Sequence, residues 1–209
     1  MKIDRTKNAG RNIVFGCMLK IYQIVMPFIM RTLMIYYMGI QYLGLNSLFT
    51  SILQVLNLAE LGVGSAMVYS MYKPIAVDDK KMICALMKLY RTYYRVIGII
   101  IAFLGLCLVP FIPKLIKSDV PADINIYILY ILNLSVTVLS YWLFAYKNCL
   151  LDAHQRTDVA SKVTLVTNTL QYIVQFFTLC FLKNYYAYII VSLAAQALTN
   201  ILTAVVTTH

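Results

Sequence analysis

The sequence predicts an all-α integral membrane protein with six transmembrane helices. Of its 209 residues, 61% are hydrophobic and only 12% are charged, whereas a soluble domain is about 45–50% apolar and about 25% charged. A membrane-spanning helix needs about 20 mainly apolar residues. The chain therefore has room for six helices joined by short loops, and for no separate water-soluble domain. The six apolar segments are residues 12–38, 43–71, 84–112, 124–147, 161–182 and 186–206.

The first segment, residues 12–38, follows a basic leader and carries two cations of its own. Lys20 and Arg31 are eleven residues apart, which on a helix places them within about 20° of one face and about 16 Å apart along the axis. Pro27 falls near the same face and is expected to kink the helix. We therefore expect a cationic, polar face. The alternative is that each long side chain reaches the nearer membrane surface.

The second segment, residues 43–71, follows a glycine-containing turn and holds an acidic residue. Its polar residues occupy an arc of about 120° on a helix: Asn46, Gln54, Asn57 and Glu60. The amides are expected to form hydrogen bonds between helices. An ionised group in hydrocarbon costs about 2.5–3.5 kcal/mol and usually faces a bundle interior or a water-filled cavity. Glu60 is therefore a candidate functional residue.

The third segment, residues 84–112, begins as an amphipathic helix with basic and aromatic residues. Arg91 and Arg95 lie close to one face and are interleaved with Tyr90 and Tyr94. Basic and aromatic side chains at a helix entry are typical of a membrane interface, which makes anchoring one interpretation. The other is that Arg91 and Arg95 enter a cavity and meet an anionic headgroup.

The last two segments, residues 161–182 and 186–206, each carry a polar stripe with helical spacing. The stripes include Gln171, Gln175, Gln196 and Thr199. We expect them to line an open flank on which a second helix bundle docks.

The distribution of Lys and Arg predicts that both termini are cytoplasmic. With the N-terminus inside, 13 of the 18 basic residues fall in inner segments, as the positive-inside rule requires. The other five are Lys20 and Arg31 within the first span, and Lys114, Lys117 and Lys183 in outer loops.

No motif indicates a catalytic site, a cofactor or a bound metal. The chain lacks the phosphate-binding loop, the zinc-binding helix, the nucleophile elbow and the dinucleotide fingerprint, and its five cysteines are isolated. Asp152, His154, Arg156 and Asp158 form the only cluster that an enzyme could use, and His154 is expected to be a solvated loop residue. We therefore expect neither an enzyme nor a cofactor. No nucleic-acid partner is expected either, because orientation explains the basic residues.

Residues 31–64 carry an ordered set of motifs. The set comprises Arg31, Gly39, Tyr42-Leu43-Gly44-Leu45, Leu48-Phe49-Thr50 and Glu60-Leu61-Gly62-Val63-Gly64. It resembles the start of a polysaccharide flippase of the multidrug/oligosaccharidyl-lipid/polysaccharide exporter superfamily. The resemblance covers essentially the whole chain but only about half of a family member, because members have two such lobes.

The resemblance implies that residues 1–209 are the N-terminal six-helix lobe of a two-lobe exporter fold whose C-terminal lobe is absent from the sequence. Such a flippase moves undecaprenyl-diphosphate-linked oligosaccharide repeats across the bacterial cytoplasmic membrane, for capsule or lipopolysaccharide O-antigen. Its central cavity carries cations that attract the diphosphate. A second six-helix lobe and membrane lipids are the expected partners.

The resemblance also implies roles for individual residues. Arg31 matches the family's first-helix arginine, and Glu60 matches its second-helix acid, which would form an ion pair or bind a coupling ion. Lys20, Arg91 and Arg95 are assigned to the substrate cavity by helix face and charge.

Two other functions stay open. One is a lipid-modifying membrane enzyme or an assembly subunit of the polysaccharide machinery. The other is an exporter of drugs or other lipids from the same superfamily. A cationic drug would need acids in the cavity, whereas four candidate cations outnumber the single acid Glu60. This balance favours an anionic substrate.

Overall fold

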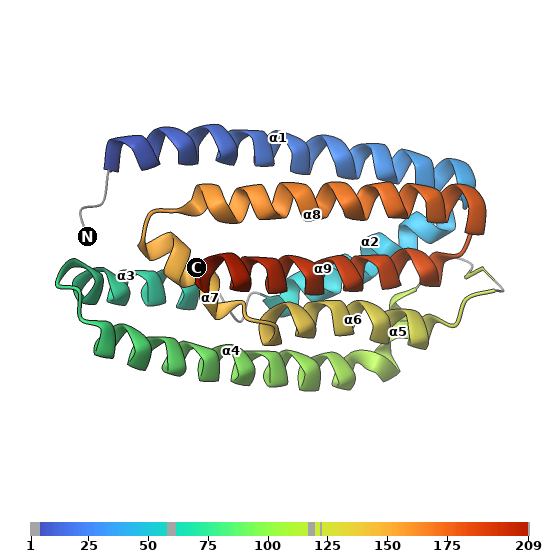
Figure 1. The fold of residues 1–209 in the computed structure, drawn as a ribbon. Coiled ribbons are helices and arrows are strands. Elements are labelled where there is room, and N and C mark those ends of the chain that lie inside the picture. Colours follow the sequence, from blue (N-terminus) through green and yellow to red (C-terminus); the bar gives the residue numbers. More distant parts are fainter. Residues whose placement is uncertain (1–4, 58–61, 117–119, 122, 209) are drawn as a thin grey trace.

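The computed structural model describes residues 5–57, 62–116, 120–121 and 123–208, and every regular element within these ranges is a helix. Figure 1 shows the long helices side by side in one bundle. Four helical segments are long and apolar enough to cross a membrane: Gly10–Tyr37, Lys80–Leu115, Thr157–Leu182 and Tyr185–Thr207. They belong to α1 (Arg5–Tyr37), α4 (Lys80–Leu108), α8 (Thr157–Phe177) and α9 (Tyr185–Thr208). The predicted first, third, fifth and sixth spans are thus confirmed as helices.

The prediction that residues 43–71 form a single continuous helix was wrong. The structure has α2 (Ile40–Asn57) and α3 (Val63–Ala76), which follow each other along the bundle. Gly62 precedes α3 with a φ of +88°, a left-handed conformation that ends helical geometry and that glycine adopts readily. Glu60 lies outside the described residues.

The fourth predicted span, residues 124–147, is also divided. Helix α6 (Ile126–Trp142) ends before Phe144, whose φ is +59°, and α7 (Tyr146–Ala153) continues at an angle of 48° to it. Counted together, α6 and α7 make a fifth helical segment able to cross a membrane. The described residues therefore show a membrane-type bundle with four or five such segments.

The helices pack in a ring. Helix α1 packs on α8, α8 on α9, α9 on α6, and α6 on α4, while α2 closes the other side against α1, α4 and α6. Helix α1 begins and α9 ends at the same end of the bundle (Figure 1). Short caps fix the helix starts, because the side-chain oxygens of Asp79, Asn125 and Asn184 accept backbone N–H groups of the first turns of α4, α6 and α9.

The centre of the bundle is aromatic and tightly packed. Phe49 on α2 meets Tyr130 on α6 with their ring centroids 5.7 Å apart, and both side chains are completely buried. Helix α4 presents Gly98 and Gly105 to α6, where an added Cβ atom would overlap Trp142 and Leu134 respectively. These glycines let the two backbones approach closely, as small residues do in membrane bundles.

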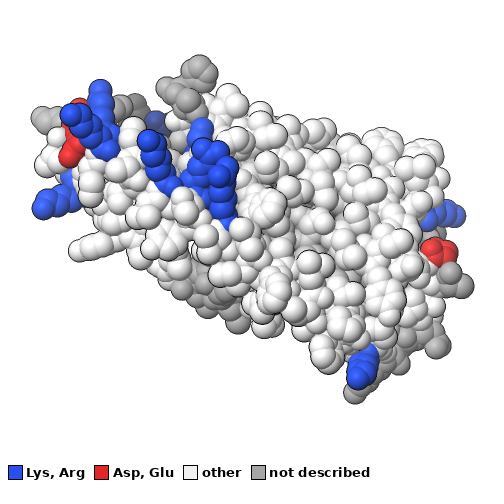
Figure 2. Space-filling model, turned by 90° about the horizontal axis from the view of Figure 1, so that it is seen from below, with Lys and Arg blue, Asp and Glu red and all other residues white. Residues whose placement is uncertain are grey.

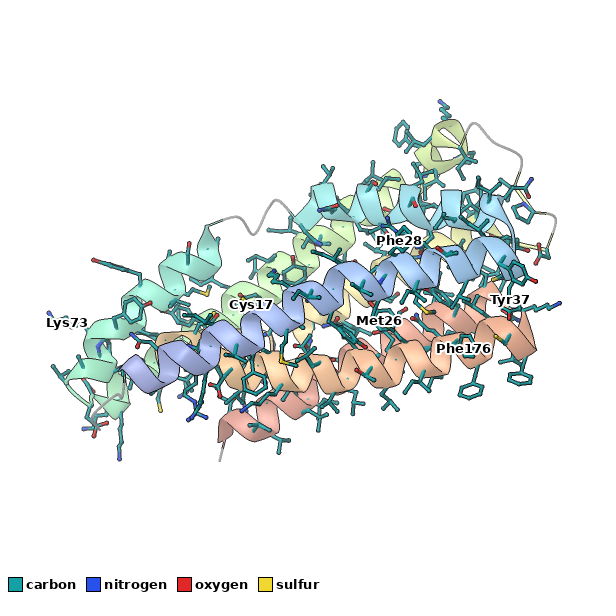
Figure 3. All side chains as sticks on the ribbon, turned by 90° about the horizontal axis from the view of Figure 1, so that it is seen from above. Cys17, Met26, Phe28, Tyr37, Lys73 and Phe176 are labelled. Atoms are coloured by element: carbon teal, nitrogen blue, oxygen red, sulfur yellow. The ribbon has the colours of Figure 1, made fainter. Side chains whose placement is uncertain are left out.

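The outer surface is apolar between the two ends of the bundle. Most of α1 faces outward. In the view of Figure 3, Met26 lies on its side toward α8, whereas the exposed Phe28 lies on the other side. Lys73 marks one end of the bundle in this view and Tyr37 the other. Figure 2 shows most of the visible Lys and Arg side chains gathered at one end, an uncharged surface in the middle, and a few charged side chains at the other end. This distribution is typical of a protein embedded in a membrane.

Candidate functional site

Arg31, an exposed residue of α1, lines a polar cavity between the helices of the bundle. The cavity has a volume of about 200 Å³ and lies where α1, α2, α8 and α9 meet. Its walls comprise Pro27, Met30, Arg31, Met34, Asn46, Gln171, Tyr172, Gln175, Tyr188 and Ser192. Two tyrosines, three amides and a serine therefore surround one cation within an otherwise apolar bundle.

The two glutamine side chains of the cavity are held by bonds between α8 and α9. Gln175 Nε2 donates to Ser192 Oγ at 2.7 Å and to the carbonyl oxygen of Tyr188 at 3.3 Å, and Gln171 Nε2 donates to the same Ser192 Oγ at 3.4 Å. Gln175 is only 1% exposed, and its Oε1 has no hydrogen-bond partner among the described residues. An unpaired buried acceptor costs about 1–3 kcal/mol, so a donor on a water molecule or a ligand would stabilise this wall.

The guanidinium of Arg31 has no ion-pair partner within 4 Å in the described part of the chain. A charged group within a membrane-spanning segment costs about 2.5–3.5 kcal/mol unless it is hydrated or paired, and Arg31 lies within such a segment of α1. The surrounding amides and hydroxyls make the cavity polar enough for water, and they supply no negative charge. The arrangement therefore presents an uncompensated positive charge, which suits an anionic ligand.

The structure does not bring the four candidate cations together. Lys20 is exposed and does not line the Arg31 cavity, although it shares a face of α1 with Arg31. Arg91 and Arg95 are exposed on α4, which lies on the opposite side of the bundle from α1 (Figure 1). Within the described residues, Arg31 alone among the predicted cations lines this cavity.

The prediction that the polar stripes of α8 and α9 line an open flank was wrong for most of their length. The stripes face each other, as the bonds of Gln175 show, and Thr199 Oγ1 donates to the buried Thr167 Oγ1 at 2.7 Å. Gln196 Nε2 donates to Asn200 Oδ1 on its own helix. Gln171, Gln175 and Ser192 line the cavity together with Arg31, which was not predicted from the sequence. The helical spacing of the stripes was the available signal.

A second, larger cavity of about 720 Å³ lies between α3, α4, α6 and α7. Its lining residues are Gly64, Ser65, Val68, Tyr69, Tyr72, Tyr94, Ser140, Tyr141, Ala145, Asn148, Cys149 and Asp152. No Lys, Arg or His is among them. It is therefore less suited to an anion than the Arg31 cavity.

The residues that an enzyme could have used do not converge. Asp152 lines the larger cavity, whereas His154 Nδ1 lies 2.8 Å from the carbonyl oxygen of Leu150. Arg156 pairs with Asp158 where α8 meets α1. The described residues hold no group of three or more His, Cys, Asp or Glu side chains that could bind a metal.

Comparison with known proteins identifies no relative: no protein-family model, no curated protein and no solved structure matches this chain.

Proposed function

We propose that this chain is the N-terminal lobe of a flippase that moves undecaprenyl-diphosphate-linked oligosaccharide repeats across the cytoplasmic membrane for surface polysaccharide synthesis. The observation that carries the proposal is the cavity around Arg31. Arg31 is the first residue of the ordered set of motifs in residues 31–64. It lines a polar cavity in an apolar bundle and has no ion-pair partner among the described residues.

The chemistry of such a substrate fits this cavity. A diphosphate carries about two negative charges, which are costly to move through a low-dielectric region. Arginine offsets that cost by direct pairing and can bind phosphate oxygens through two parallel N–H bonds. The second N–H of Gln171 Nε2 and the hydroxyls of Tyr172 and Tyr188 add donors around the same cavity.

The proposal includes an arrangement in the membrane. Helices α2 and α3 together form one crossing and α6 and α7 another, which gives six crossings with both termini cytoplasmic. A second six-helix lobe completes the transporter and covers the outward face of α1, where Lys20 lies about 16 Å from Arg31 along the helix axis. Glu60 is assigned to ion pairing or coupling. Arg91 and Arg95 anchor α4 at the cytoplasmic surface.

Binding of undecaprenyl diphosphate to the purified full chain tests the proposal. The chain is placed in lipid nanodiscs, and bound ligand is counted by native mass spectrometry. Arg31→Ala should weaken binding at least about tenfold, the value of a hydrogen bond to a charged group. Arg31→Lys should retain part of the affinity, because charge survives and the bidentate geometry does not. Lys73→Ala, which removes an exposed cation far from the cavity, is the matched control.

Export in cells gives a second, independent readout. With a complementary second lobe present, Arg31→Ala should abolish polysaccharide export at normal protein levels. Near-normal export by Arg31→Gln would show that Arg31 only anchors the helix, and the site assignment would then fall. Preferential binding of a cationic drug by the chain would instead favour a drug exporter.

A further inference from the structure

Three basic side chains converge on one buried carboxylate where α1 meets α8. Asp158 is completely buried. Its Oδ2 accepts Arg11 Nη2 at 2.7 Å, Arg11 Nε at 3.2 Å and Lys162 Nζ at 3.4 Å, and its Oδ1 accepts Arg156 Nε at 3.1 Å. We call Arg11, Arg156, Lys162 and Asp158 the Asp158 cluster. The backbone N–H of Asp158 also donates to Asn12 Oδ1 at 2.9 Å, which fixes the carboxylate in place.

The Asp158 cluster is left with an excess of positive charge and of donors. Three cations share one anion, and no second carboxylate of the described residues lies within 4 Å of them. The side chains of Arg11, Arg156 and Lys162 are 34%, 44% and 46% exposed. An arginine has five N–H donors, and Arg156 uses only Nε toward described residues. The other N–H groups of these cations belong to partly exposed side chains that their bonds to Asp158 hold in place.

The position of the Asp158 cluster matches the headgroup level of a membrane. Gly10 and Thr157 begin two of the segments that are long and apolar enough to cross a membrane, so the cluster lies at the start of both. Lys162 Nζ lies 4.3 Å from the ring centroid of Phe15, an aromatic contact of the kind found at membrane interfaces.

Exposed apolar side chains continue from the cluster along both helices. Helices α1 and α8 run in the same direction (Figure 1). Around the axis of α1, the side chain of Met18 points within about 20° of that of Arg11. Around the axis of α8, the side chain of Val166 points within about 40° of that of Lys162. Both apolar side chains are strongly exposed. A molecule with a phosphate on the cations can therefore lay a hydrocarbon chain along these exposed apolar side chains.

We propose that the Asp158 cluster binds the phosphate of an anionic glycerophospholipid, with an acyl chain lying along Met18 and Val166. The buried carboxylate orders the three cations before the lipid arrives, and their net charge selects anionic over zwitterionic headgroups. This lipid site is separate from the Arg31 cavity and does not depend on the proposed transport function.

Spin-labelled lipids test this site in the intact chain. The full chain is reconstituted in phosphatidylcholine bilayers, and electron paramagnetic resonance measures the immobilised fraction of spin-labelled phosphatidylglycerol and of spin-labelled phosphatidylcholine. We expect clear selectivity for phosphatidylglycerol. Lys162→Gln and Arg156→Gln should each reduce that selectivity about fivefold, the effect of about 1 kcal/mol per basic residue at a membrane surface. Lys183→Gln, an exposed cation on the α8–α9 turn, should leave it unchanged.

Further variants separate a lipid site from a structural cluster. Lys162→Arg keeps the charge and should keep the selectivity, and Val166→Asn should reduce retention of the lipid while the charges stay in place. Equal immobilisation of both lipids, or wild-type selectivity in both Gln variants, would overturn the proposal. Displacement of the labelled lipid by inorganic phosphate as effectively as by unlabelled phosphatidylglycerol would also overturn it, since the acyl chain would then contribute nothing.

Discussion

The hydroxyl group of Tyr130 on α6 donates to the backbone carbonyl oxygen of Gly105 on α4 at 3.1 Å. Both residues are buried. The bond is possible because Gly105 has no side chain, so that α6 can approach the backbone of α4 directly. It joins the two helices at the aromatic centre of the bundle, beside the contact between Tyr130 and Phe49.

Gly105→Ala should therefore destabilise the fold. The added Cβ would overlap Leu134, which is buried and cannot move aside, and overpacking of this kind costs about 1–3 kcal/mol. Gly98→Ala is the matched comparison, because its Cβ would meet Trp142, whose half-exposed side chain can rotate away. Chemical unfolding of the full chain in mild detergent measures both losses. A loss for Gly98→Ala equal to that for Gly105→Ala would contradict this account.

Ser192→Ala should weaken the contact between α8 and α9. The Ser192 hydroxyl accepts from Gln175 and Gln171, and bonds of this kind between membrane helices are worth about 0.6–1.7 kcal/mol. The measurement is again the free energy of unfolding in detergent. Ser51→Ala serves as the control, because the exposed Ser51 hydroxyl donates only within α2, to the carbonyl oxygen of Ser47. The interpretation fails if the two variants lose the same stability.

Asp158→Asn should destabilise the junction of α1 and α8 more than the loss of any one of its cations. The substitution leaves three positive side chains around a neutral group, and a hydrogen bond to a charged group is worth about 1.5–3 kcal/mol. We expect a loss of about 2 kcal/mol, against about 1 kcal/mol or less for the partly exposed Arg156→Gln. Asp78→Asn, at an exposed turn, should have no effect. Wild-type stability of Asp158→Asn would show that the Asp158 cluster does not hold the helices together.

Thiol labelling tests the orientation in the membrane. Val77 lies exposed in the turn between α3 and α4, and Ile40 lies exposed at the start of α2. In a chain whose exposed Cys17, Cys84 and Cys107 are replaced by Ala, Ile40→Cys should react with a charged reagent in intact cells. Val77→Cys should react only after permeabilisation, because the basic end of the bundle is expected to be cytoplasmic. The reverse pattern would invert the orientation.

Local patterns in the sequence predicted the helices well, because the apolar runs that form α1, α4, α8 and α9 are properties of single segments. The breaks were harder to predict. Gly62 and Phe144 adopt positive φ values within apolar runs, and nothing in the hydropathy of residues 43–71 or 124–147 marks a change of direction. Glycine permits such a conformation readily. Such a φ is uncommon for a residue with a side chain, so Phe144 gave no signal of it in the sequence.

The candidate site could be predicted only one helix at a time. Helical spacing placed Gln171 and Gln175 on one stripe of the fifth span and singled out Arg31 on the first. It could not show that α1 packs on α8 in addition to its sequence neighbour α2, because this packing depends on residues far apart in the chain. The same limit applies to Arg91 and Arg95, whose charge suggested a shared cavity although α4 lies on the other side of the bundle from α1.

The bond between Arg11 and Asp158 spans 147 positions of the chain, and this separation sets an order of biogenesis. At about 5–20 residues per second, a ribosome completes Asp158 on the order of ten seconds after Arg11. During that interval α1 has left the ribosome and its main packing partner, α8, does not yet exist. Its long apolar surface keeps it in lipid meanwhile. The polar wall beside Arg31 forms only when α8 and α9 arrive, so a nascent chain that stops early leaves this arginine among lipid without the amide and hydroxyl groups of that wall.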